Sequence, residues 1–262
     1  ELKPFYELVK SVDPSMKVMG PGAVSVGPPM AGWNDEFFRA GGGKYIDAFS
    51  FHAYNCVNGD LTLVRRSFDQ IDTWLRQYNL AGIEKWQTEQ GFYGPTWGGY
   101  QPRMQGRWTM LQMMTYEQYG IPKEHNHYWY DRNGGFWDHP CWIENEDESI
   151  NPVGPLLRVW SEELYGTNFV SKYDFGNPGN QLFVGNLFTG VGKQVAAFMT
   201  AGETQSQLDL LITGASSVKV VSPFGVERVV PVVAGKVTLP VGELPTYVEF
   251  SGTLNVLRSD WG

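Results

Sequence analysis

The chain has 262 residues, a formal charge of −8 and a pI near 5.0, which argue against nucleic acid and anionic lipid as partners. No segment approaches the roughly 18 consecutive apolar residues of a membrane span, and the length allows one large or two modest domains. Aromatic residues reach 15%, which suits stacking on the flat faces of sugar rings, although ordinary core packing explains such a content as well.

Two cysteines, Cys56 and Cys141, exclude a disulfide-rich scaffold and a zinc finger. A single bridge between them stays open, with two free thiols as the favoured state. The sequence opens inside an amphipathic helical pattern and carries no signal peptide there, so we interpret it as a mature product or a piece of a longer chain. We expect a secreted or periplasmic protein.

Helical and strand patterns alternate through the first part of the chain. Helical spacing of apolar residues covers 5–12, 34–40, 61–78, 103–119 and 155–165. Strand patterns cover 17–22, 45–54, 83–89 and 127–131, and the second of these is almost wholly apolar, as in a parallel sheet buried on both faces. The alternation predicts parallel strand–helix–strand units.

The sequence pattern changes at Thr167. From there, short segments in which apolar and polar residues alternate are separated by turns rich in Gly, Pro and Ser. These segments are 181–186, 194–200, 207–213, 218–222, 226–233, 236–240 and 246–251. Such spacing is typical of an antiparallel β-sandwich. We therefore predict an α/β domain over 1–166 and an all-β domain over 167–262.

One strand of the α/β part ends in a carboxylate, Glu89, and the preceding strand ends in His52 and Tyr54. Period-two alternation places Glu89 on the same face as Lys85 and Gln87. Because α/β folds place their chemistry at the carboxyl ends of parallel strands, these side chains are candidates for one site. The alternative is that Glu89 is a solvated strand-end residue and His52 a buried, satisfied histidine.

Trp129 lies on the strand that follows and would face the same site. A carboxylate held by the Tyr54 hydroxyl beside an aromatic platform is suited to attack or stabilise an oxocarbenium-like sugar centre. A hydrogen bond from tyrosine keeps such a carboxylate ionised, as a nucleophile requires. No cofactor or metal is needed for this chemistry.

Three motifs in order resemble the sixth, seventh and eighth strands of clan A retaining glycoside hydrolases, closest to family 39 and its neighbours in families 5 and 51. They are IDAFSFHAY (46–54), WQTEQG (86–91) and YWY (128–130). Segments 218–225, 236–240 and 244–249 are similar to the accessory β-sandwich of these enzymes. The resemblance covers most of the chain and rests on the ordered set, since each motif alone is weak.

The resemblance implies a glycosidase of carbohydrate metabolism that degrades β-linked glycosides or polysaccharides with retention. Glu89 would be the nucleophile, His52 and Tyr54 would position it and the sugar, and Trp129 would form the floor of the −1 subsite. Further stacking residues would come from the aromatic loops, with loop packing as the alternative for each of them. These candidates are Trp97, Tyr100, Trp137 and Trp142, with Tyr93 as a weaker one.

The sequence departs from the family in one respect. The family's general acid/base belongs to an Asn-Glu pair at the end of the fourth strand, and no such pair ends a strand within 1–44. Asn145-Glu146 lies in an acidic loop after the last strand instead. The fold implied is therefore a partial (β/α)₈ barrel, strands five to eight, followed by the sandwich. The missing strands would come from a separate chain, a second copy or an N-terminal half.

Two other functions compete with this interpretation. One is a non-catalytic carbohydrate-binding or degenerate half-barrel protein, in which Glu89 only hydrogen-bonds sugar. The other is a metal-dependent hydrolase using His125, His127 and His139, for which surface polarity is the favoured alternative. The sugar, the linkage, endo or exo action and the oligomeric state stay open.

Overall fold

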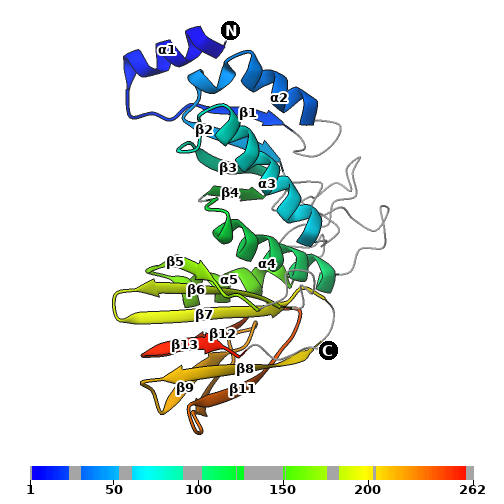
Figure 1. Cartoon of the computed structure of the whole chain (residues 1–262), viewed down its shortest axis with the longest axis vertical. Helices are drawn as coiled ribbons and strands as arrows, with labels where there is room; N and C mark the ends of the chain where they lie inside the picture. Colours follow the sequence, from blue (N-terminus) through cyan, green and yellow to red (C-terminus); the bar gives the residue numbers. More distant parts are fainter. Residues whose placement is uncertain are drawn as a thin grey trace. The chain divides into compact units, whose positions relative to one another are not determined.

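A computed structural model describes most of the chain, and Figure 1 shows its elements along the sequence. The described residues are 2–23, 31–52, 61–90, 102–121, 123–126, 150, 152–175, 183–202 and 205–257. Contacts divide the chain into two units, which are Glu1–Tyr100 with Thr115–Glu148 and Gln101–Met114 with Ser149–Gly262. The domain boundary near residue 166 stays a prediction.

The first unit alternates helices with strands. Its elements are α1 (Leu2–Val12), β1 (Met19–Ala23), α2 (Ala31–Arg39), the 3₁₀ helix η1 (Gly42–Tyr45), β2 (Ala48–His52), α3 (Leu61–Gln77), β3 (Glu84–Gln90) and β4 (Lys123–Asn126). The strands pair in parallel in the order β1-β2-β3-β4. The prediction of parallel strand–helix–strand units is confirmed, whereas closure into a barrel stays a prediction.

The core of the first unit lies between strand β2 and helix α3. Phe49 and Phe51 alternate along β2 toward this core, and α3 contributes Phe68 and Ile71 at helical spacing. The Phe51 and Phe68 rings meet edge to face at 5.9 Å. Full burial of one such side chain contributes about 1.5–3 kcal/mol, so this contact fixes β2, and with it the residue at the strand's end.

Two predicted strands differ in extent from those observed. The segment 45–54 begins with the end of η1, and the strand itself is Ala48–His52. The left-handed backbone of Gly41, at φ 83°, opens the 3₁₀ turn and delays the extended conformation. The strand predicted over 127–131 is preceded by β4 at Lys123–Asn126, and 127–131 itself lies outside the described residues.

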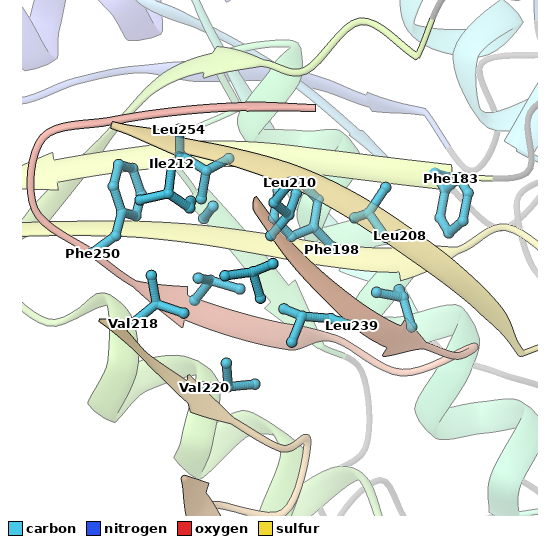
Figure 2. Packing of buried hydrophobic residues seen from close by; sticks show 14 residues of the cluster. Phe183, Phe198, Leu208, Leu210, Ile212, Val218, Val220, Leu239, Phe250 and Leu254 are labelled. Atoms are coloured by element: carbon cyan, nitrogen blue, oxygen red, sulfur yellow. The ribbon is translucent and has the colours of Figure 1, made fainter. Parts of the chain in front are cut away.

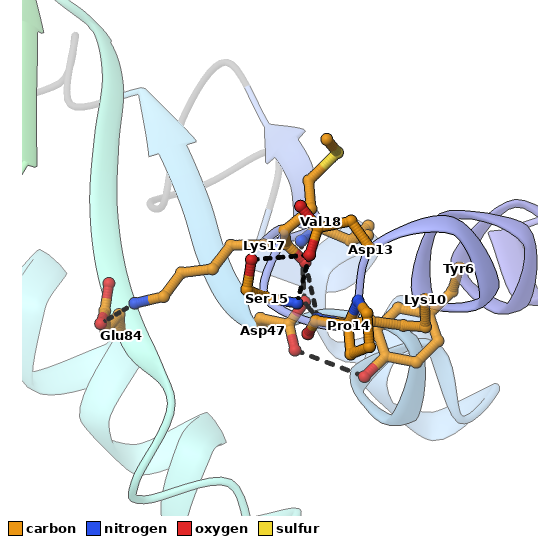
Figure 3. A network of polar contacts seen from close by, with 10 residues as sticks. Tyr6, Lys10, Asp13, Pro14, Ser15, Lys17, Val18, Asp47 and Glu84 are labelled. Atoms are coloured by element: carbon orange, nitrogen blue, oxygen red, sulfur yellow. Dashed lines mark hydrogen bonds and ion pairs between the residues drawn. The ribbon is translucent and has the colours of Figure 1, made fainter.

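Polar contacts anchor helix α1 to the residues that immediately precede β1 and β2, as Figure 3 shows. The Tyr6 hydroxyl donates to Asp47 Oδ1 at 3.3 Å, and Lys10 Nζ lies 2.9 Å from Asp47 Oδ2. The backbone amide of Val18 donates to the same oxygen at 2.8 Å. Asp47 therefore fastens α1 to the entry into β1.

Helix α1 nevertheless leaves several of its apolar side chains exposed to solvent. Phe5, Leu8 and Val12 are all exposed, and no residue of the helix is fully buried. Met19 of β1 is exposed as well, and β1 forms one edge of the described parallel sheet. The amphipathic helix is confirmed, but the partner of its apolar side is not among the described residues. Nor does any helix within those residues combine the length and apolar character of a membrane span.

The second unit consists of helix α5, two antiparallel sheets and the first part of α4 (Pro102–Gln118). The helix α5 spans Val153–Leu164, and the strands are β5 (Thr167–Lys172), β6 (Phe183–Gly190), β7 (Lys193–Thr200), β8 (Ser206–Thr213), β9 (Ser217–Val221), β10 (Glu227–Pro231), β11 (Lys236–Val241), β12 (Thr246–Glu249) and β13 (Thr253–Val256). Their orders are β10-β9-β12-β7-β6-β5 and β11-β8-β13.

The two antiparallel sheets share one apolar core, shown in Figure 2. Phe198 and Val220 enter it from the six-stranded sheet, and Leu208 and Leu210 enter it from the three-stranded one. Strict alternation along β8 buries every second side chain, as the sequence pattern predicts. Strands β5 and β13 were not predicted.

The part of α4 that belongs to the second unit, up to Met114, is held by the antiparallel sheets. Arg107 Nη2 donates to the carbonyl oxygen of Ala201 at 2.6 Å. The buried Asn186 Nδ2 of β6 donates to the carbonyl oxygen of Met114 at 2.8 Å. A Cβ atom at Gly106 would lie 2.8 Å from the Leu156 side chain of α5, so glycine permits this close helix packing.

Candidate active site

His52 and Glu89 lie side by side at the carboxyl ends of β2 and β3. They are cross-strand partners, and His52 Nδ1 is 3.7 Å from Glu89 Oε2. The His52 side chain is 15% exposed and the Glu89 side chain 34% exposed. The prediction that these strand ends converge is confirmed for this pair. The Glu89 carboxylate is therefore partly accessible to solvent, whereas the His52 side chain is largely buried.

The two faces of β3 carry different contacts. Lys85 Nζ reaches Asp72 Oδ1 of helix α3 at 2.8 Å, so this side chain points to the helix layer. Trp86 Nε1 instead donates to Glu84 Oε2 at 2.7 Å, and Glu84 also pairs with Lys17. Glu84 is thus engaged with an indole and an ammonium at the start of β3, at the opposite end of the strand from Glu89.

A register shift reverses the alternation just before Glu89. Phe51 lies opposite Gln87, but the next residue, His52, lies opposite Glu89 rather than Thr88. The sequence-based prediction that Glu89 shares a face with Lys85 and Gln87 is wrong, because an extra residue in one strand moves every later side chain to the other face. The side chain of Glu89 therefore lies on the same face of the sheet as that of His52, and not on the face that packs against α3.

Two side chains hold this irregular segment. Gln87 Nε2 donates to the carbonyl oxygen of Glu89 at 2.6 Å, and Thr88 Oγ1 donates to the carbonyl oxygen of Phe51 at 3.4 Å. Gln87 is 0% exposed. Sequence reasoning missed the part played by Gln87. No local sequence signal could have found it, because the contact depends on the register of β3 against β2.

The remaining predicted site residues lie outside the described residues, and their roles stay predictions. They are Tyr54, Tyr93, Trp97, Tyr100, Trp129, Trp137 and Trp142. The same holds for Cys56, Cys141, the pair Asn145-Glu146, and the histidines His127 and His139. His125 belongs to β4, where only the backbone is described. The metal-site alternative is therefore untested.

A hollow of about 530 Å³ lies in the second unit, within that unit's own residues and not at Glu89. Val220 and Leu244 contribute apolar walls, and the ion pair of Arg103 with Glu243 adds charge. No aromatic side chain among the described residues lines it. The Glu89 strand end remains the better candidate, because there a partly exposed carboxylate lies beside a histidine at the carboxyl ends of parallel strands.

No protein-family model matches this sequence, and no curated protein matches it. Similarity is found among solved structures. A family 39 glycoside hydrolase from the gut symbiont Bacteroides cellulosilyticus superposes with a TM-score of 0.74 at 18% identity, covering 94% of this chain and 53% of that one.

Two further structures show the same relationship. A family 30 endoxylanase from Clostridium papyrosolvens gives a TM-score of 0.57 at 16% identity, covering 98% of this chain and 61% of that one. A family 51 α-L-arabinofuranosidase from Bifidobacterium longum gives 0.61 at 12% identity, covering 96% and 62%.

The chain thus spans between about half and two thirds of the length of these solved structures. At such low identities the likeness speaks for the fold alone. The fold neighbours are clan A glycoside hydrolases of families 39, 30 and 51. The resemblance of the strand motifs predicted this clan and its families 39 and 51, whereas family 30 was not predicted.

Proposed function

We propose that this chain is part of a retaining glycoside hydrolase that acts on β-linked glycosides or polysaccharides, with Glu89 as its nucleophile. The observation that carries this is the pair His52–Glu89, 3.7 Å apart at neighbouring carboxyl ends of parallel strands. The fold neighbours support a glycosidase kind of function. A secreted or periplasmic location suits a polysaccharide substrate.

In the first step a Glu89 carboxylate oxygen attacks the anomeric carbon. The new bond joins this oxygen to the carbon, and the bond to the leaving oxygen breaks while that oxygen takes a proton from a general acid. Water then attacks the same carbon, passes its proton to the former acid and releases Glu89. His52 lies close enough to orient the carboxylate, and Tyr54 and Trp129 are proposed to hold the sugar.

The mechanism requires a second carboxyl group roughly 5–5.5 Å from the first. We assign this group to polypeptide outside these 262 residues, on strands that complete a (β/α)₈ barrel of which residues 1–166 form strands five to eight. The exposed apolar side of α1 and the open edge of β1 support this assignment. Residues 167–262 would be the accessory β-sandwich.

A covalent-trapping assay tests the nucleophile. The chain is incubated with a panel of 2-fluoro-glycosides carrying dinitrophenyl leaving groups, which need no acid catalyst, and the adduct is located by peptide mass mapping. We expect an adduct on Glu89 that is absent in Glu89→Gln. The matched control is Glu84→Gln, which removes a carboxylate from the same strand and should leave labelling intact.

The outcome also separates the enzyme from its rival, a non-catalytic carbohydrate-binding or degenerate half-barrel protein. Binding of oligosaccharides that persists in Glu89→Gln, with no adduct in the unsubstituted chain, would favour the binding protein. An adduct on any other carboxylate would remove Glu89 from its role. Sugar preference within the panel reports the substrate class at the same time.

A further inference from the structure

We propose that Gln87 is a positioning residue that fixes the register shift and thereby aims the Glu89 carboxylate at His52. The inference rests on the proposed function only for its catalytic consequence, because the positioning itself concerns side-chain geometry. Gln87 would act through Glu89 and would not touch the sugar.

The register shows what Gln87 has to achieve. Along β3, Lys85 points to Asp72 of helix α3, so regular alternation would send both Gln87 and Glu89 toward the helix layer. The observed pairing passes from Phe51–Gln87 directly to His52–Glu89. One residue, Thr88, is thus left over, and this single insertion turns Glu89 to the face that His52 occupies.

The side chain of Gln87 bridges the irregular segment. Its Nε2 donates to the carbonyl oxygen of Glu89 at 2.6 Å, which ties the peptide on the far side of Thr88 back to the residue before it. Thr88 Oγ1 donates to the carbonyl oxygen of Phe51 at the longer distance of 3.4 Å. The shorter contact, from a fully buried donor, is the stronger constraint on the Glu89 backbone.

Side-chain chemistry makes glutamine specific for this task. The donor must reach a carbonyl two residues along the strand, and Gln87 does this while 0% exposed. Methionine has the same unbranched length but no donor, and would leave the Glu89 carbonyl oxygen without this bond. Glutamate would place an acceptor against an acceptor. Gln87→Met therefore removes the hydrogen bond while nearly preserving the packing volume.

The test measures the contact between carboxylate and imidazole without any need for activity. The ring nitrogens of His52 are followed by nitrogen NMR, with the signals assigned from His52→Gln. Glu89→Gln is compared in two backgrounds, the unsubstituted chain and Gln87→Met. We expect Glu89→Gln to shift the His52 signals in the first background and to shift them by roughly half as much or less in the second.

The matched control is Gln112→Met, which makes the same substitution at a glutamine that is 2% exposed but belongs to helix α4. In that background the shift caused by Glu89→Gln should keep its full size. A full-size shift in folded Gln87→Met would overturn the proposal. So would the absence of any shift in the unsubstituted chain, since the contact to be positioned would then be missing.

Two further measurements keep the outcome decisive. If Gln87→Met does not fold, side-chain amide hydrogen exchange of Gln87 in the unsubstituted chain decides instead, with slow exchange expected and rapid exchange contradicting the bond.

Where the chain is labelled by 2-fluoro-glycosides, Gln87→Met should slow adduct formation on the order of tenfold to a hundredfold. If no adduct forms on the unsubstituted chain, the proposed function fails, and the NMR comparison still decides the role of Gln87.

Discussion

The parallel sheet of the first unit and the antiparallel sheets of the second differ in how regularly their strands pair. All three described pairings of the parallel sheet carry a register shift, and each shift lies near the carboxyl end of a strand. Of the seven antiparallel pairings described, only β5–β6 has one. Strands β6 and β7 pair over eight consecutive residues without a break.

This difference separates two tasks of a β-sheet. Unbroken register stacks alternate side chains into one core, which favours stability. A register shift interrupts the hydrogen-bonded pairing of two strands and turns a side chain to the other face. For this reason bulges are frequent beside active sites. Substitutions in the antiparallel sheets should therefore change the free energy of unfolding, whereas those at the ends of β2 and β3 should change the contacts of Glu89.

The largest expected effect is that of Phe198→Ala, in the core of the regular sheets. Phe198 is fully buried between the two sheets, and its truncation should cost about 3–5 kcal/mol of unfolding free energy. Denaturant unfolding followed by circular dichroism measures this. The control is Val229→Ala, at a side chain 73% exposed on the edge strand β10, where a change beyond about 0.5 kcal/mol is not expected.

The second prediction concerns Lys219, which has three carboxylates around it. Its Nζ lies 3.0 Å from Glu249, 3.5 Å from Glu227 and 3.7 Å from Glu163, and Glu163 is buried. Lys219→Met should cost about 1–3 kcal/mol, because the carboxylates lose their counter-ion and Glu163 cannot turn to water. Chemical unfolding at neutral pH measures the loss, and an unchanged midpoint would contradict it.

The same cluster has a pH signature. Burial alone would lower the pKa of Lys219, but the hydrogen bond to Glu249 and the charges of Glu163, Glu249 and Glu227 raise it above its ordinary value of 10.5. The stabilisation is complete below pH 10.5 and fades as pH rises through the higher folded-state pKa. Lys219→Met should flatten this alkaline loss in unfolding curves.

Asp47 should give a smaller effect, confined to the attachment of α1. Burial would raise the pKa of Asp47, but the backbone amide of Val18 and the ammonium of Lys10 hold it below its ordinary value of 3.8. Its contribution is present above pH 3.8 and lost as pH falls through the lower folded-state pKa. Asp47→Asn should cost about 1 kcal/mol and remove this acid-dependent part.

Hydrogen exchange of the α1 amides is the appropriate measurement for Asp47→Asn. Faster exchange in residues 2–12, with unchanged protection of β7, would support local loosening of the helix. Equal exchange in both proteins would show that the apolar contact of Leu2 with the core, rather than Asp47, holds the helix.

The smallest stability change belongs to Glu89→Gln, which should alter the unfolding free energy by no more than about 0.5 kcal/mol, because the side chain is partly exposed. Thermal unfolding checks this. A large gain in stability would show that the carboxylate is strained in place, and a large loss would give it a structural role. Either result would weaken the contrast between regular and irregular sheets.

Local patterns predicted much of the fold. The helical spacing of Phe68, Ile71 and Trp74 indicated the buried side of α3, and alternation indicated β8 and β11. Strands β5 and β13 were not predicted, because neither shows a clear apolar face in the sequence. Most residues of β5 are exposed, and β13 has only four residues. The proximity of His52 to Glu89 followed from their places at strand ends.

What escaped prediction at the site was the direction of Glu89. Alternation in the sequence predicts which side chains share a face only for a regular strand. The extra residue at Thr88 arises from the pairing of β3 with β2 and interrupts that alternation. That pairing joins residues more than thirty positions apart, so no local pattern around Glu89 reveals it. The donor of Gln87 could be recognised only once this register was known.

Helix α4 carries a practical consequence for dissecting the protein. The part of α4 up to Met114 depends on the Ala201 carbonyl oxygen, the Asn186 amide and close packing against α5. A stop codon at residue 166 would strip away the first two and leave Arg107 and the Met114 carbonyl oxygen facing water. Although the two parts look separable in sequence, such a truncation should yield an insoluble or protease-sensitive product, and functional studies should keep the polypeptide whole.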